Sequence, residues 1–239
     1  MAPRVRIVGP GRAGGSFRAA LSGAGWDVEL LDRGAPVRDA AHEVDLLLLC
    51  VPDRAVADVA ASVAPEPDAV VAHCAGSLRL DVLDPHPRVA SVHPLVALPS
   101  AAIGAARLRG AWYGVAGDPI VHRVVSALDG RGVTVDEDHR VEYHAAAVVA
   151  SNHLVALLGQ AERVAAVAGV PLDAYLELAR GSLADVADLG PAAALTGPVS
   201  RGDWDTVRRH LRALPPEERP AYRALADEAA RLAGRRPPT

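Results

Sequence analysis

The first 32 residues place a glycine-rich turn between two apolar runs. The run at 5–8 leads directly into GPGRAG at 9–14, which is a G-x-G-x-x-G pattern, and an amphipathic segment follows at 16–22. A second apolar run at 28–31 ends at Asp32. The order strand, glycine turn, helix and strand is typical of the first unit of a parallel α/β sheet. The N-terminal part of the chain is therefore predicted to be α/β.

The three glycines of this pattern have separate roles in a phosphate-binding turn. Gly9 would form the tight turn, Gly11 would let a pyrophosphate approach the backbone, and Gly14 would let the helix pack closely on the strand. The N-terminus of the helix would supply N–H donors for the phosphate charge. A glycine turn that binds nothing is the alternative, but the flanking strand and the following acid favour a dinucleotide. The predicted contacts come from Gly9, Pro10, Gly11, Arg12, Ala13 and Gly14.

The identity of the dinucleotide stays open between two neighbouring residues. Asp32 would accept hydrogen bonds from a ribose 2′-hydroxyl and would repel a 2′-phosphate, which favours NAD. Arg33 would pair with that phosphate and favour NADP. The sequence therefore predicts NAD(P), with Asp32 and Arg33 as the residues that discriminate between the two forms.

Composition limits the partners of the chain and the groups available for its chemistry. The net charge of −4 gives no general attraction to nucleic acid or membranes, and no apolar run is expected to span a membrane. All 25 basic residues are arginines, so any acid–base group must be His, Asp, Glu, Tyr or Cys. Cys50 and Cys74 are expected to be buried free thiols in a reducing cytosol, and two cysteines make no zinc site. We expect a cytoplasmic protein with a small-molecule substrate and no metal.

Further apolar runs alternate with helical segments and predict a parallel sheet. They lie at 45–51, 69–74 and 89–92. In such a sheet the ligand crevice lies beyond the carboxyl ends of the strands. The residues predicted to line it there are Val51, Pro52, Gly76, Ser77, His93 and Pro94.

The character of the chain changes near residue 137. Strand-like runs at 111–116 and 132–135 close the sheet, and helical periodicity continues from there to the end. The fold predicted is an α/β, Rossmann-type doubly wound parallel sheet at 1–137, followed by a smaller all-α domain at 138–239. Because this helical domain is rich in alanine and buries little apolar surface alone, a homodimer through it is expected. The helices predicted there run from Asp138 to about 168 and over 171–183, 185–195, 203–213 and 217–233.

Two polar segments of the helical domain carry candidate chemistry. On the long helix, His144 and Ser151 are seven residues apart and would share a face, flanked by Asn152 and His153. Histidine is the usual acid–base residue near neutral pH, although a hydrogen-bonded core histidine is the alternative. In the second segment, 195–203, a capping box of Ser200 and Asp203 is a purely structural reading. The functional reading has Thr196 and Arg201 facing a substrate, and both readings stay open.

Five segments together resemble a known family. They are VGPGRAG, HCAGS, SVHPL, YHAAAVVASNH and LTGPVSRGD, in that order. They resemble a bacterial family of Rossmann-like proteins of unassigned substrate, described as NAD(P)-dependent oxidoreductases, whose helical C-terminal domain is related to that of 6-phosphogluconate dehydrogenase. More distantly, His93-Pro94 and the histidine pair His144 and His153 are similar to prephenate dehydrogenases, where such residues line the substrate site. Ketopantoate reductases and hydroxyacid dehydrogenases use a lysine on the equivalent helix, which this chain lacks.

The resemblance implies hydride transfer between a nicotinamide cofactor and a small keto acid, hydroxy acid or imine. Either His144 or His153 would be the acid–base group. A non-catalytic dinucleotide-binding sensor or partner protein is the alternative, because the missing lysine fits that role too. The candidate catalytic residues are His93, His144, Ser151, Asn152, His153 and Thr196.

Overall fold

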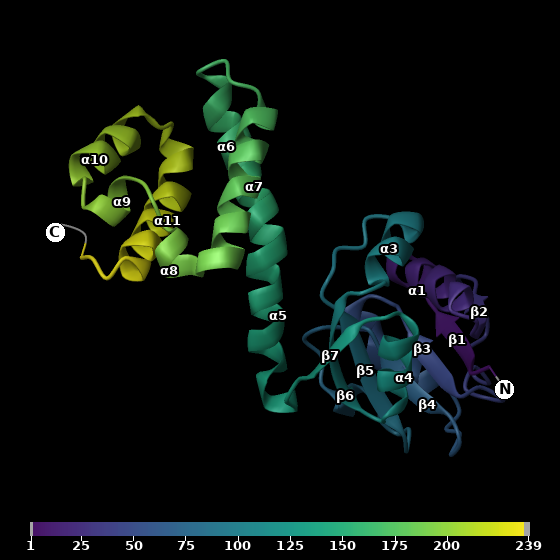
Figure 1. The fold of residues 1–239 in the computed structure, drawn as a ribbon. Coiled ribbons are helices and arrows are strands. Elements are labelled where there is room, and N and C mark those ends of the chain that lie inside the picture. Colours follow the sequence, from purple (N-terminus) through teal and green to yellow (C-terminus); the bar gives the residue numbers. More distant parts are fainter. Residues whose placement is uncertain (1, 237–239) are drawn as a thin grey trace. The chain divides into compact units, whose positions relative to one another are not determined.

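The structure, a computed structural model, describes residues 2–236 of the 239-residue chain. It consists of two compact units that divide at Ser151 and Asn152 (Figure 1). The first is an α/β unit and the second contains only helices.

The first unit is built on a seven-stranded sheet in the order β2-β1-β3-β4-β5-β6-β7. Strands β1 to β5 are parallel, and the chain reverses its direction of travel across the sheet at β1, as in doubly wound folds. The predicted Rossmann-type α/β fold is thus confirmed. The strands are β1 Arg4–Val8, β2 Asp27–Leu31, β3 Leu46–Leu49, β4 Val70–His73, β5 Val89–Pro94, β6 Trp112–Gly117 and β7 Arg131–Thr134.

The last two strands differ from the fully parallel sheet predicted. Strand β6 is antiparallel to β5, with Pro94 opposite Tyr113, and β7 is parallel to β6. The amide of Leu95 donates to the carbonyl of Trp112, so β6 begins beside the end of β5 and runs back along it. Because β5 extends through Pro94, His93 lies within a strand and not beyond it as predicted.

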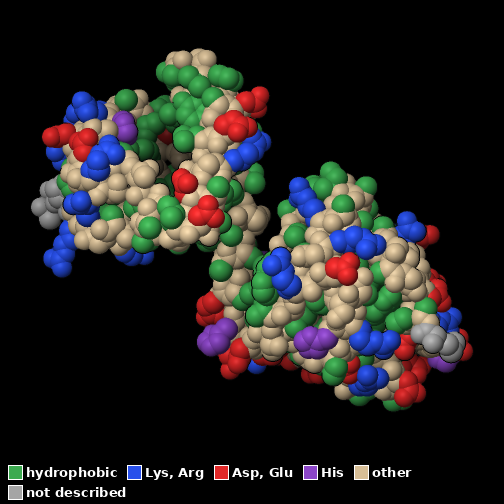
Figure 2. All heavy atoms as spheres, viewed as in Figure 1, with side chains coloured by type: hydrophobic (Ala, Val, Ile, Leu, Met, Phe, Trp, Pro, Cys, Tyr) green, Lys and Arg blue, Asp and Glu red, His purple; other side chains and the backbone are tan. Residues whose placement is uncertain are grey.

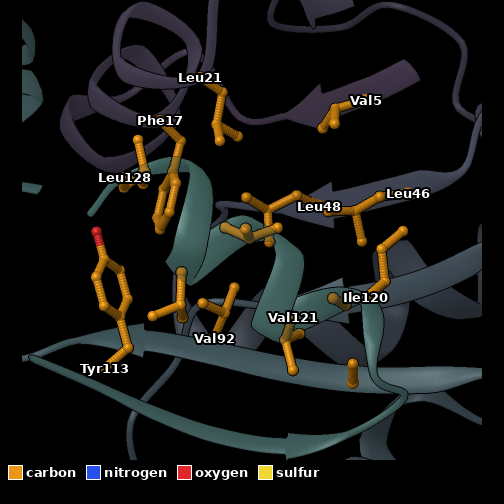
Figure 3. Close-up of a cluster of buried hydrophobic side chains, with 14 of the residues drawn as sticks. Val5, Phe17, Leu21, Leu46, Leu48, Val92, Tyr113, Ile120, Val121 and Leu128 are labelled. Carbon is orange, nitrogen blue, oxygen red and sulfur yellow. The ribbon is translucent and has the colours of Figure 1, made fainter. Parts of the chain in front are cut away.

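Helices cover both faces of this sheet. Alternate leucines of β3 point to opposite faces, with Leu46 and Leu48 in one buried cluster and Leu47 and Leu49 in the other. Figure 3 shows the first cluster, which also contains Phe17. Cys50 is buried and Cys74 half-buried, and both are free thiols. The helices are α1 Arg12–Gly23, α2 Val56–Ser62, α3 Ala101–Leu108 and α4 Ile120–Ala127, with 3₁₀ turns at Asp53–Ala55, Leu80–Leu83 and Glu137–His139.

The long helix predicted from Asp138 is present but interrupted. It consists of α5 Arg140–Val148, a π-helical turn Val149–His153 and α6 Leu154–Ala166. Its N-terminal cap is not Asp138 as predicted, because the side chain of Asp136 accepts from the amide of Asp138.

The compact units divide within this helix and not at residue 137, where strands give way to helices. The reason is that α5 contributes side chains to the first unit, including the buried Arg140. The helical stretch Glu137–Ala166 also satisfies the length and composition of a membrane span, with a mean hydropathy of 1.2. This is a test of length and composition alone, and one such helix is weak evidence for a membrane span.

The second unit contains α7 as one helix where two were predicted. Gly181 lies inside this helix. The helix ends at Gly190, because Gly190 has a φ of 78° and Pro191 follows it. The buried carboxylate of Glu218 accepts from Arg163 and Gln160 of α6, which ties the C-terminal helices to α6. The remaining elements are α7 Leu172–Leu189, α8 Pro191–Ala194, α9 Pro198–Arg201, α10 Trp204–Ala213, a 3₁₀ turn Pro216–Glu218 and α11 Arg219–Leu232.

Candidate active site

The glycine turn after β1 has the geometry that a phosphate-binding turn requires. Gly9 has a φ of +109°, and a Cβ there would lie 2.5 Å from the carbonyl oxygen of Cys50. A Cβ on Gly14 would lie 2.0 Å from the carbonyl oxygen of Gly9. A Cβ on Gly11, in contrast, would meet no atom of the described part of the chain within 4 Å. Two glycines thus close the turn, and the third leaves its outer side open to a ligand.

The N-terminus of α1 opens onto this space without a side-chain cap. Gly11 is the N-cap residue, no side chain within residues 2–236 caps this end of the helix, and the first turn carries no acidic residue. The amides of Arg12, Ala13 and Gly14 therefore have no partner within the helix. Free amides and the positive end of the helix dipole bind anions. The turn fits the pyrophosphate of a dinucleotide.

The residues that would discriminate between NAD and NADP lie at the end of the neighbouring strand. Asp32 and Arg33 follow β2 directly, and both are exposed. At the end of β3, Val51 is half-buried and Pro52 is exposed. These positions lie at the carboxyl edge of the sheet near its reversal point, as predicted.

Two histidines from distant parts of the sequence meet above Gly76. A Cβ on Gly76 would lie 2.5 Å from Cδ2 of His144 and 2.9 Å from Cε1 of His93. The two rings are 5.7 Å apart between centroids, at 74°. The structure therefore brings together three of the residues singled out in the sequence, from the end of β4, from β5 and from α5. Ser77, the next residue, is half-buried.

Tyr143 is part of this cluster and was not among the predicted site residues. Its hydroxyl lies 2.8 Å from Nδ1 of His93, and the two rings meet edge to face at 5.6 Å. The hydroxyl also lies over Gly114, where a Cβ would be only 2.4 Å away. No local sequence signal pointed to Tyr143, because its partner His93 lies 50 residues away in the chain.

A buried arginine and a third histidine lie behind the pair. Arg140 is 1% exposed and donates to Glu137 Oε1 at 3.1 Å and to the carbonyl of Ala75 at 3.3 Å. His73 is fully buried, and neither of its ring nitrogens makes a hydrogen bond of normal geometry to a residue within 2–236. Neither residue was singled out in the sequence, because nothing marked them as buried.

These surroundings keep two of the imidazoles neutral. Burial, assisted by the charge of Arg140, lowers the pKa of His73 to about 4. Burial, followed by the proximity of His144, Arg140 and His73, lowers the pKa of His93 to about 4. Both rings are uncharged at neutral pH, and a neutral imidazole carries one N–H donor and one acceptor nitrogen.

The π-helical turn contains the SNH segment of the predicted site. Ser151 donates to the carbonyl of Ala147 at 2.6 Å, and Ser151, Asn152 and His153 are all exposed. The expectation that His144 and Ser151 share a face assumed a regular α-helix, and the π-helical turn breaks that regularity. Such turns recur at functional sites.

The TGPVSRGD segment lies in the second unit. Thr196 is exposed, and Gly197 has a φ of +97°. The predicted capping box is wrong in its first member, because Ser200 bonds to the carbonyl of Gly197 and Asp203 alone caps α10. The carboxylate of Asp203 accepts from both the amide and the hydroxyl of Thr206, which lowers its pKa. Helix capping thus accounts for Asp203. It does not account for Arg201, whose side chain is exposed.

Comparison with known proteins gives a family model and several solved structures. A family described as a domain of unknown function (DUF2520) matches residues 115–229, just under half of the chain. No curated protein matches the sequence significantly.

Among solved structures, a candidate NADP oxidoreductase from Bacteroides fragilis is similar with a TM-score of 0.79 at 20% identity, over 96% of this chain and 98% of that one. A Thermotoga maritima protein has a TM-score of 0.73 at 24% identity, over 96% and 98%. A reductive aminase from Aspergillus terreus, solved with NADPH, has a TM-score of 0.71 at 17% identity, over 99% and 97%. At these identities the likeness establishes the fold of the chain.

Proposed function

We propose that the chain is an NAD(P)-dependent oxidoreductase acting on a small keto acid, hydroxy acid or imine. The observation that carries the proposal is the glycine turn, where Gly9 and Gly14 leave no room for a side chain while Gly11 faces open space. Two of the similar structures support it, because one is described as an NADP oxidoreductase and the other was solved with NADPH. When bound, the nicotinamide ring supplies or accepts the hydride. The test is a titration of the purified chain with NADPH and NADH.

Each group of residues has a proposed task. The amides that follow Gly11 bind the pyrophosphate, and Asp32 or Arg33 contacts the adenosine ribose. His93 and His144 contact the reacting part of the substrate above Gly76. The remaining candidates would bind the cofactor at the strand ends or orient the substrate, and they are Val51, Pro52, Ser77, Ser151, Asn152, His153 and Thr196.

Replacing His144 with alanine is expected to lower turnover about 100-fold while cofactor binding is retained. The reason is that the variant loses an acid–base group but no contact of the glycine turn. Steady-state loss of NADPH absorbance, together with a cofactor titration, measures both effects. A variant with undiminished turnover would remove His144 from the proposed role.

A non-catalytic dinucleotide sensor on the same fold is the second candidate. The observation that favours it is the absence of lysine from the whole chain, since related reductases use one for catalysis. A panel of 2-keto acids and imines separates the two functions. Tight cofactor binding without oxidation of NADPH or NADH across the panel would favour the sensor.

We also propose a cytoplasmic homodimer that forms through the helical unit. Figure 2 shows hydrophobic side chains gathered over α6 and α7. The exposed residues include Val155 at 70%, Leu178 at 67% and Leu189 at 61%. Isolated apolar side chains are normal on a surface, but several on two adjacent helices are typical of an interface.

Leu178→Asp is expected to raise the dimer dissociation constant at least 10-fold, because burying one leucine contributes roughly 1.5–3 kcal/mol. Light scattering over a dilution series measures the mass. Leu225→Asp is the matched control, because Leu225 is an exposed leucine on α11, outside this helix pair. A wild-type chain that stays monomeric at high concentration would contradict the proposal.

A further inference from the structure

The hydroxyl of Tyr143 makes a hydrogen bond to the ring of His93. Its oxygen lies over Gly114, and burial raises the pKa of Tyr143. The same oxygen lies 2.8 Å from Nδ1 of His93. All three residues belong to the first unit, on β6, α5 and β5.

The direction of this hydrogen bond follows from the donors available. A phenol has one O–H donor and two acceptor lone pairs. Within residues 2–236 the hydroxyl of Tyr143 makes one hydrogen bond of normal geometry, to Nδ1 of His93. Burial raises the pKa of Tyr143, so the phenol keeps its proton. That proton points to Nδ1 of His93. Since the ring of His93 is neutral, its one remaining proton lies on Nε2.

The Nε2 side of the ring faces the space above Gly76. A Cβ on Gly76 would lie 3.0 Å from Nε2 of His93, and the ring of His144 borders the same point. The charged and titratable groups around His93 are Arg140, His73, His144 and Tyr143. None of these four is an anion at neutral pH, and the buried guanidinium of Arg140 disfavours a second positive charge.

We infer that the site takes a carbonyl substrate, in which the oxygen accepts a hydrogen bond from Nε2–H of His93, and that Tyr143 is the positioning residue that fixes this tautomer. A carbonyl oxygen has lone pairs for such a donor. An imine accepts hydride as its protonated iminium, whose nitrogen carries a proton and has no free lone pair, so the two N–H groups would face each other. A neutral imidazole N–H polarises a carbonyl without transferring its proton. The proton that the reduced oxygen needs comes from His144, the proposed acid–base group. This inference rests on the proposed oxidoreductase function and selects, from its substrates, the ketones and aldehydes over the imines.

The tautomer of His93 can be read without any cofactor. Two-bond ¹⁵N–¹H spectra of the labelled full chain distinguish Nε2–H from Nδ1–H. The wild-type protein is expected to show Nε2–H at His93, and Tyr143→Phe is expected to give a mixture of both forms. Tyr222→Phe is the matched control, because Tyr222 makes the same contact with Nδ1 of His210, at 2.7 Å and edge to face. Nδ1–H at His93 in the wild type would overturn the inference, as would an unchanged ratio in Tyr143→Phe.

Substrate pairs then test the class of compound. A 2-keto acid and a cyclic imine of similar size are compared with NADPH, while cofactor binding is titrated separately. The carbonyl compound is expected to give a kcat/KM at least 100-fold higher, and Tyr143→Phe is expected to lower its kcat about 10-fold at unchanged cofactor affinity. Cofactor binding with preferred reduction of the imine would overturn the carbonyl assignment alone. Absence of cofactor binding would overturn the proposed function as well.

Discussion

Replacing Gly11 with valine is expected to weaken dinucleotide binding at least 100-fold without unfolding the chain. The backbone of Gly11 is extended, with φ −77° and ψ −167°, and its missing side chain faces open space. Valine adopts this conformation but is a poorer N-cap than glycine, so the free energy of unfolding is expected to fall by no more than about 1 kcal/mol. Its methyl groups would occupy the space through which a pyrophosphate approaches the turn. Fluorescence titration with NADPH and urea unfolding measure the two quantities separately.

Gly14→Ala serves as the contrasting variant in the same experiment. Its Cβ would lie 2.0 Å from the backbone oxygen of Gly9, so the strand and the helix would have to move apart. The free energy of unfolding is expected to fall by about 3 kcal/mol or more, because a clash with backbone atoms cannot be relieved by a rotamer change. Gly181→Ala is the control, since Gly181 lies within α7 with no atom near its Cβ position, and it should be neutral or slightly stabilising. A folded Gly11→Val chain that binds NADPH as tightly as the wild type would show that the phosphate site lies elsewhere.

Acid is expected to destabilise the first unit through His73. Its pKa is about 4 in the folded chain, against an ordinary value of 6.5, so the unfolded state binds the extra proton between these values. Stability is therefore complete above pH 6.5 and falls as the pH is lowered toward 4. This pKa shift corresponds to a contribution of roughly 3 kcal/mol at most to the free energy of unfolding. About 2 kcal/mol of that contribution would be lost by pH 5.

His73→Leu removes this titration and both buried nitrogens that lack good partners. The variant is expected to be as stable as the wild type or more so at pH 5, since leucine needs no hydrogen bonds in a site of 0% exposure. Urea unfolding at pH 7 and pH 5 gives the difference. His122→Leu is the control at an exposed histidine of α4, and it should follow the wild-type pH dependence. Equal pH dependence in His73→Leu and the wild type would contradict the role given to His73.

The fold could be predicted from the sequence because its signals are local and repeated. Buried strands such as 46–49 are continuously apolar, and the glycine pattern marks the first turn. His93 and Gly76 were predicted to lie together because parallel strands end at one edge of the sheet. The reversal of β6 could not be predicted in this way. It depends on where α3 returns the chain, and a strand has no separate sequence pattern for its direction.

The rest of the cluster depends on contacts between distant residues. Arg140 and His73 are polar side chains that only the packing of α5 against the sheet makes buried. Tyr143 reaches His93 because residue 114, over which its hydroxyl lies, is a glycine. Gly114 and Tyr143 are 29 residues apart, so no local pattern reveals their contact. The π-helical turn at 149–153 likewise has no sequence spacing that predicts it. It changes the number of residues per turn, on which the expected common face of His144 and Ser151 depended.

The central claim is that the turn at Gly9–Gly14 binds a nicotinamide dinucleotide. Isothermal titration calorimetry of the wild-type chain with NADPH and with NADH tests it most directly. We expect saturable binding of at least one of them at one site per chain, with tighter NADPH binding if Arg33 contacts the ribose and tighter NADH binding if Asp32 does. No binding of either dinucleotide at millimolar concentration would contradict the claim.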